Sequence, residues 1–196
     1  MNFTEFQNKM LTCLQLQDEL NNRINPNWKE ERTETDYDNL QIEVVDIFHF
    51  LLSLILLKHY KLDKEDFFTG YTDIAISLFY YGLEYSKKLT IDELIVKTET
   101  IAKQALLEND TGLLINFAEV VNTVFESFNQ MYLLYIGKNM LNHIRQEYGY
   151  KTGDYKKVIN GLEDNKYLTQ IIRQVKDETE LRETIRKAFE ELQVNT

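Results

Sequence analysis

Glycine and proline are scarce in this chain, and their scarcity limits the folds that it can adopt. The 196 residues include 7 Gly and 1 Pro, together about 4% where roughly 12% is usual. Because strands need frequent turns, this composition favours long helices joined by short connections. The sequence therefore predicts an all-α fold, a helical bundle of about six or more helices.

Apolar side chains recur near the helical period along most of the chain. The expected helices cover residues 3–21, 38–60, 65–87, 91–108, 112–145 with a break near Gly137, and 164–192. The helix over 38–60 is apolar almost all round, which predicts that it lies inside the bundle. The connection Gly149–Glu163 carries lysines and aromatic residues, and it is a candidate functional loop.

Length, charge and cysteine content narrow the classes of function. A chain of this length favours one domain over residues 1–196. The net charge of −10 argues against binding to nucleic acid through the overall field. The most apolar stretch, Ile47–Leu57, has about half of the ~20 residues that a membrane span needs, and the first residues do not read as a secretory signal. A lone cysteine, Cys13, fits a reducing compartment, so we expect a cytoplasmic protein without membrane or nucleic-acid partners.

An acidic pair, Glu43 and Asp46, lies on the central predicted helix. Residues three apart share one helical face, and His49 follows less than two turns further on. Oxygen ligands at this spacing suit Mg²⁺, which bridges carboxylates to substrate phosphates. The alternative is a solvated first turn, where the helix dipole favours acids; the apolar flanks weaken that alternative. A histidine alone at such a position is more often a core residue than a ligand, so the core interpretation of His49 is the favoured one when it is taken by itself.

A basic cluster lies in the last third of the chain. Lys138, Asn142 and Arg145 share one helical face. The following loop adds Tyr150, Lys151, Tyr155, Lys156 and Lys157. Several cations so close together in an acidic protein suit a polyphosphate, since arginine binds two oxygens at once. The alternative is a solvated basic face.

Three further residues, Gln17, Asn21 and Trp28, could bind a base. Amides can pair with the edge of a base, and Trp offers a flat wall for a ring. The alternative is structural, with Asn21 ending a helix and Trp28 filling the core. Cys13 sits at an apolar helix position and is expected to be structural.

Several segments of the sequence match the motif order of one known family. They are Leu14–Asn21 (LQLQDELN), Asn27–Trp28, Ile42–Phe50 (IEVVDIFHF), Ile136–Lys157 (IGKNMLNHIRQEYGYKTGDYKK) and Asn160–Asn165 (NGLEDN). With these motifs the chain resembles the dimeric, all-α dUTPases of the all-α nucleotide pyrophosphatase superfamily. Residues 58–130 match in helical character only.

The resemblance implies a homodimer that hydrolyses dUTP and dUDP to dUMP, releasing pyrophosphate or phosphate, with Mg²⁺ and a metal-activated water. It implies that Glu43 and Asp46 hold the metal and that a carboxylate accepts the proton of the water. Base and sugar contacts are implied at Gln17, Asn21, Trp28, His49 and Asn142. Phosphate contacts are implied at Lys138, Arg145, Tyr150 and a lysine among Lys151, Lys156 and Lys157.

One departure from the family lies between Trp28 and Ile42. The family places there a helix with a second carboxylate pair, E-x-x-E, whereas this chain has only the short segment Lys29–Gln41. Glu31 and Glu34 have that spacing but lack an apolar face, which favours coincidence. The explanation that we favour is a segment missing from this sequence near Arg32.

Three functions remain open at this stage. The leading one is a Mg²⁺-dependent dUTP pyrophosphatase. The second is a pyrophosphatase for another pyrimidine nucleotide, which substrate screening would separate. The third is a non-catalytic helical dimer or nucleotide-binding regulator, which a truly absent E-x-x-E helix would favour because half a metal site neutralises a triphosphate poorly.

Overall fold

The computed structural model describes residues 37–62, 70–159 and 161–194, together with Lys9, Thr12 and Leu16. The chain divides into two compact units, Met1–Asp36 and Tyr37–Thr196, and the second contains all of the elements described below. The predicted helix over residues 3–21 falls outside the described residues apart from those three positions. The single-domain assignment therefore stays a prediction.

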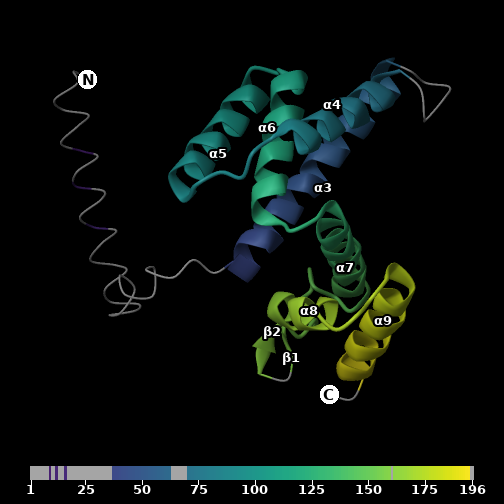
Figure 1. The fold of residues 1–196 in the computed structure, drawn as a ribbon. Coiled ribbons are helices and arrows are strands. Elements are labelled where there is room, and N and C mark those ends of the chain that lie inside the picture. Colours follow the sequence, from purple (N-terminus) through teal and green to yellow (C-terminus); the bar gives the residue numbers. More distant parts are fainter. Residues whose placement is uncertain are drawn as a thin grey trace. The chain divides into compact units, whose positions relative to one another are not determined.

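The described part of the chain is almost entirely helical (Figure 1). Its helices are α3 (Tyr37–Leu62), α4 (Tyr71–Tyr85), α5 (Ile91–Leu106), α6 (Asp110–Val124), α7 (Phe128–Glu147), α8 (Asp164–Ile172) and α9 (Glu178–Val194). Two short strands, β1 (Val158–Ile159) and β2 (Leu162–Glu163), pair antiparallel, with Val158 opposite Glu163. The all-α prediction is confirmed.

Two of the predicted helices are each divided in two. In the segment 112–145 the break lies between Val124 and Phe128, not at Gly137, because the Ser127 hydroxyl accepts a hydrogen bond from the Gln130 amide and caps α7. Gly137 lies inside α7. The segment 164–192 divides into α8 and α9, and the Asp177 carboxylate accepts a hydrogen bond from the Glu180 amide where α9 begins.

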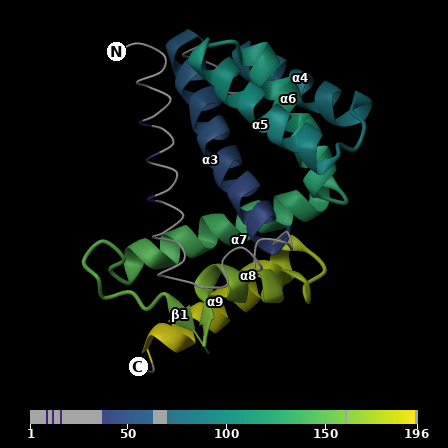
Figure 2. The same ribbon diagram turned by 90° about the vertical axis from the view of Figure 1, so that its left-hand side faces the viewer.

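The helices form two groups that α3 connects. Figures 1 and 2 show α4 and α5 packed on α6, and α8 and α9 packed on α7. Helix α3 contacts α4 and α6 in the first group and α7 and α8 in the second. Its position between the groups sets the distance between its own polar side chains and those of α7.

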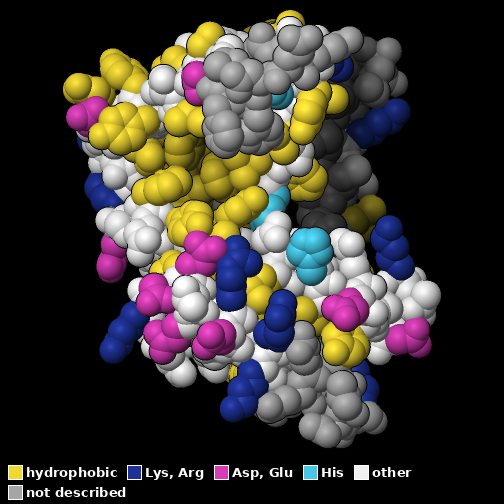
Figure 3. All heavy atoms as spheres, turned by 90° about the vertical axis from the view of Figure 1, so that its right-hand side faces the viewer, with side chains coloured by type: hydrophobic (Ala, Val, Ile, Leu, Met, Phe, Trp, Pro, Cys, Tyr) yellow, Lys and Arg dark blue, Asp and Glu magenta, His cyan; other side chains and the backbone are white. Residues whose placement is uncertain are grey.

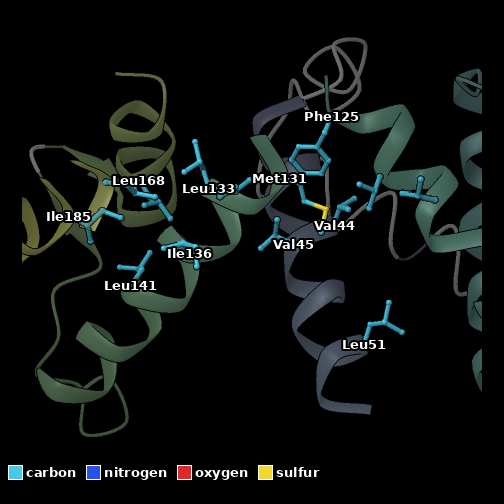
Figure 4. Packing of buried hydrophobic residues seen from close by; sticks show 14 of the residues in the cluster. Val44, Val45, Leu51, Phe125, Met131, Leu133, Ile136, Leu141, Leu168 and Ile185 are labelled. Carbon is cyan, nitrogen blue, oxygen red and sulfur yellow. The ribbon is translucent and has the colours of Figure 1, made fainter. Parts of the chain in front are cut away.

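The core around α7 explains how this helix is held. Figure 4 shows Val45 of α3 and Met131 of α7 where these two helices pack against each other. Further along α7, Ile136 and Leu141 lie close to Leu168 of α8 and Ile185 of α9. All belong to one cluster of buried residues, so α7 is packed between α3 and the pair α8–α9.

Helix α3 is less buried than its sequence predicts. Val45 and Leu51 are buried, but Phe50 is 78% exposed and Leu57 is 53% exposed. Among the described residues the prediction of a helix enclosed on all sides is therefore wrong, because none of them covers one apolar face of α3. Within the described ranges α3 alone is long and apolar enough to cross a membrane, a test of length and composition that core helices of soluble proteins also pass.

Candidate active site

An ion pair between α3 and α7 lies at the centre of the candidate site. Glu43 and Asp46 lie three residues apart on α3; Glu43 is exposed and Asp46 is partly buried. The Lys138 Nζ lies 3.2 Å from Asp46 Oδ1, although only 2% of the Lys138 side chain is exposed. The predicted carboxylate pair and the predicted basic face thus meet across two helices.

Asn142 and Arg145 continue the polar face of α7 beyond Lys138. Arg145 Nη1 donates to Asn142 Oδ1 at 3.4 Å. Asn165, near the start of α8, accepts hydrogen bonds with its Oδ1 from both Lys138 Nζ and Arg145 Nη2, each at 3.2 Å. One amide oxygen therefore connects the two cations that the sequence assigns to phosphate.

Arg145 is also held by Asp164, the first residue of α8. Its Nε and Nη2 donate to the two carboxylate oxygens of Asp164 at 2.9 and 2.7 Å. Burial lowers the pKa of Arg145, but the Asp164 hydrogen bonds and charge outweigh it and raise this pKa above its usual value. The guanidinium carbon lies 5.6 Å from the centre of the Tyr150 ring, within the range of a cation–π contact.

His49 presents a neutral imidazole near this cluster. Its ring centre lies 4.6 Å from that of Tyr135 on α7. Burial lowers the pKa of His49 below 6.5, and the nearby Lys138 lowers it further, against the opposing effect of Asp46. Its Nε2 is buried without a hydrogen-bond partner among the described residues. Such an atom is available to a polar ligand group.

The loop after α7 begins with a tight turn at Gly149. This residue has φ of 80°, and its carbonyl accepts hydrogen bonds from the Thr152 and Asp154 amides. A Cβ there would lie 2.6 Å from Thr152 Oγ1, so glycine is required by both conformation and space. The turn places Tyr150 beside Arg145.

The three loop lysines do not all face the site. Lys151 and Lys156 are exposed. Lys157 forms an ion pair with Glu163 at 2.7 Å across the β1–β2 ribbon, and the Glu163 hydrogen bond raises the pKa of Lys157. Lys157 is therefore engaged by a neighbouring carboxylate in this structure.

Seven of the predicted site residues come from α3, α7 and the turn after α7. They are Glu43, Asp46, His49, Lys138, Asn142, Arg145 and Tyr150. Gln17, Asn21 and Trp28 lie outside the described residues, as do Glu31 and Glu34. The roles assigned to all of these residues stay predictions.

Two residues of the cluster were not assigned a role from the sequence, namely Asp164 and Asn165. The only available signal was their position in the segment NGLEDN, at the start of an amphipathic helix. Acids are common in a first helical turn and are usually solvated. The burial of Asp164 against Arg145, 19 positions away, depends on the docking of α8 on α7, which local sequence does not reveal.

Comparison with protein-family models gives the family of this helical chain. A family model described as dUTPase matches residues 9–150, which is more than half of the chain. The chain belongs to the dUTPase family, and it is a dUTP diphosphatase, an enzyme that hydrolyses dUTP. No match was found among curated proteins. The family match ends at Tyr150, before α8 begins.

Proposed function

We propose that this enzyme hydrolyses dUTP and dUDP to dUMP in a Mg²⁺-dependent reaction, releasing pyrophosphate or phosphate through attack by an activated water. The observation that carries the proposal is the carboxylate pair on α3 next to the buried ammonium of Lys138 on α7. A nucleotide with several phosphates needs both a bound cation and basic side chains, because its charge has to be neutralised on more than one side.

Glu43 and Asp46 are the residues that would hold Mg²⁺. The donor set fits this ion, since Mg²⁺ takes one or two carboxylates, keeps several waters and binds substrate phosphates. Within the described ranges there is no group of three or more metal-binding side chains, so waters and phosphate oxygens would complete the coordination. When bound, Mg²⁺ would activate a water and neutralise charge on the phosphates.

The chain's own residues would bind and orient the nucleotide. Lys138 and Arg145 would bind phosphate oxygens and stabilise the charge that develops on the leaving group. Asn142 and the neutral ring of His49 are the proposed contacts for base or sugar, together with Gln17, Asn21 and Trp28. Glu43 or Asp46 would accept the proton of the attacking water. Tyr150 and one of the loop lysines would close the phosphate side.

We propose a homodimer for the assembly, supported by an apolar face of α3 that the other described residues leave exposed. Figure 3 shows hydrophobic side chains gathered over the half of the molecule formed by α3–α6, whereas charged side chains gather over the half formed by α7–α9. Ile47 and Phe50 line an apolar pocket of about 180 Å³. Surfaces of this kind mark protein–protein contacts. Light scattering would test the proposal: Phe50→Ser should give a monomer, and Val158→Ser, exposed on the ribbon, should leave the dimer intact.

The function is tested by pyrophosphate release from dUTP with and without Mg²⁺. We expect Mg²⁺-dependent turnover by the 196-residue chain and its loss in Glu43→Gln, because this substitution removes a proposed metal ligand. The variant should stay folded, since Glu43 is exposed. Glu99→Gln, an exposed acid on α5, is the matched control. Binding of dUTP without turnover would count against the proposal and would indicate that a second carboxylate helix is needed.

Two further assays complete the test. Phosphate release from dUDP examines the diphosphate activity, and dCTP and dTTP examine the preference for uracil.

A cytoplasmic location, favoured by the single cysteine, is a further proposal that microscopy of the tagged chain would examine.

A further inference from the structure

Asp164 has every acceptor position of its carboxylate occupied. Its Oδ1 accepts hydrogen bonds from Arg145 Nη2 at 2.7 Å and from the backbone amide of Asn165 at 2.8 Å. Its Oδ2 accepts from Arg145 Nε at 2.9 Å and from the Tyr155 hydroxyl at 3.0 Å. An ionised carboxylate has about four acceptor sites, so Asp164 has none left for a metal ion or a water.

The burial of this pair is not explained by stability. Asp164 is fully buried and the Arg145 side chain is only 13% exposed. A buried ion pair gains little net stability, because desolvation offsets the attraction between the charges. Its effect is geometric: two parallel hydrogen bonds fix the plane of a guanidinium.

The contacts of Arg145 leave one edge of its guanidinium for a ligand. Asp164 accepts hydrogen bonds from Nε and Nη2, Asn165 accepts a second hydrogen bond from Nη2, and the guanidinium carbon lies over the Tyr150 ring. Among the described residues only Asn142 accepts from Nη1, at a long 3.4 Å. Nη1 is therefore directed toward Asn142, which shares one face of α7 with Lys138.

We infer that Asp164 is a positioning residue, which holds the Arg145 guanidinium so that its Nη1 edge faces the phosphates of the nucleotide, while the Tyr155 hydroxyl holds Asp164 through its Oδ2. This inference rests on the proposed function, in which Arg145 binds phosphate. Asp164 itself does not touch substrate. A guanidinium held in place loses less conformational freedom when it binds a phosphate than a mobile one does.

Removal of the Asp164 charge should release Arg145. In Asp164→Asn the amide keeps the volume of the side chain but offers one acceptor oxygen in place of two. We expect kcat/KM for dUTP to fall about tenfold to a hundredfold, in line with the loss of hydrogen bonds to a charged group. Tyr155→Phe removes one hydrogen bond and should cost about two- to tenfold. Glu147→Gln, an exposed acid two residues after Arg145, is the control and should change nothing.

Chemical rescue separates positioning from a general structural effect. In Arg145→Ala, added guanidinium ion at tens of millimolar should bind in the space between Asp164 and Tyr150 and restore part of the dUTP turnover and affinity. In the double variant Arg145→Ala/Asp164→Asn it should restore neither. Calorimetric titration of dUTP with Mg²⁺ measures the affinity, so the experiment does not depend on turnover alone.

The outcomes distinguish the two levels of the argument. If Arg145→Ala binds and hydrolyses dUTP like the unaltered chain, the proposed phosphate role of Arg145 is wrong and the inference falls with it. If Arg145→Ala is impaired but Asp164→Asn and Tyr155→Phe are not, or if rescue is equal in the single and double variants, only the inference is wrong. Thermal unfolding of each variant shows whether it is folded. If Asp164→Asn is not folded, the activity of Tyr155→Phe tests the inference instead.

Discussion

The ammonium of Lys138 lies 3.2 Å from Asp46 Oδ1 and is almost completely buried, whereas the Asp46 side chain is 37% exposed. Lys138 therefore needs Asp46 as a counter-charge more than Asp46 needs Lys138. A buried ammonium without a counter-charge is costly, while a partly exposed carboxylate can be solvated. The same two residues are the proposed metal ligand and the proposed phosphate contact.

This asymmetry predicts different effects of the two substitutions. Asp46→Asn leaves the Lys138 ammonium with only the Asn165 amide oxygen as a described partner, and we expect it to lower the free energy of unfolding by about 1–3 kcal/mol. Lys138→Met replaces the buried charge by an apolar side chain of similar length, and we expect a change of less than about 1.5 kcal/mol. Both should abolish most dUTP turnover.

Urea unfolding followed by circular dichroism measures these free energies. Glu43→Gln serves as the control, because Glu43 shares the acidic face but is exposed, so it should reduce turnover without reducing stability. Equal destabilisation by Asp46→Asn and Lys138→Met would contradict the asymmetry.

The lowered pKa of His49 predicts a pH dependence of stability. Burial disfavours the charged imidazole, so the folded chain binds fewer protons at His49 than the unfolded chain below pH 6.5. The free energy of unfolding should therefore fall as the pH falls below about 6.5, with a slope of at most about 1.4 kcal/mol per pH unit for one proton.

The comparison with His49→Asn isolates this contribution. Every other titratable group is present in both proteins, so the difference between the two stability–pH curves belongs to His49. Measurements in EDTA exclude metal effects at the neighbouring carboxylates. A difference that grows with acidification in favour of the unaltered chain would contradict the prediction.

The fold could be predicted to the level of its helices but not of their packing. The start of α5 could be predicted, since Thr90 and Glu93 have the spacing of a capping box. The division between α6 and α7 could not, because apolar residues continue at the helical period across Phe125, whose side chain is buried. Ser127 is the local signal for the start of α7. In the sequence Gly137 suggests a helix break, but it lies inside α7, where this helix packs closely against α8 and α9.

The candidate site could be predicted where its residues share one helix. The spacing of Glu43 and Asp46, and of Lys138, Asn142 and Arg145, follows from the helical period alone. The ion pairs Asp46–Lys138 and Asp164–Arg145 could not be predicted, because each joins helices whose relative position depends on the core. Lys157, one of the three lysines among which the resemblance implies a phosphate contact, pairs with Glu163. This pair could not be predicted, because it depends on the short β1–β2 ribbon, which the sequence did not indicate.

The capping box at the start of α5 predicts that its removal destabilises the protein. Thr90 Oγ1 accepts from the Glu93 amide, and the Thr90 amide donates to Glu93 Oε2 at 2.9 Å. Hydrogen bonds from Lys87 and from the Thr90 amide lower the pKa of Glu93 to about 2. We expect Thr90→Ala to lower the free energy of unfolding by about 1 kcal/mol. Thr98→Ala, in the interior of α5, should be neutral or slightly stabilising because alanine is the better helix former. Equal unfolding midpoints in urea for the two variants would contradict this prediction.

Two helical glycines predict different results for the same substitution to alanine. A Cβ at Gly82 of α4 would lie 2.6 Å from Ala118 Cβ and 2.9 Å from the Ile115 carbonyl oxygen of α6, so α4 would have to move. A Cβ at Gly137 would lie 3.0 Å from Leu168 Cδ1 and 3.2 Å from Ile172 Cδ1, both ends of flexible side chains. Alanine gains about 1 kcal/mol over glycine in a helix at either position.

We therefore expect Gly82→Ala to be destabilising by about 1–3 kcal/mol, the usual cost of overpacking, and Gly137→Ala to stay within about 1 kcal/mol of the unaltered chain. Urea unfolding at constant m-value measures both. Because Gly137 precedes Lys138, dUTP turnover of Gly137→Ala also reports whether α8 has shifted: a stable variant with lost turnover would indicate that the contact between α7 and α8 sets the positions of Asn165 and Arg145. If Gly82→Ala proves as stable as Gly137→Ala, the close approach of α4 to α6 is not what requires glycine.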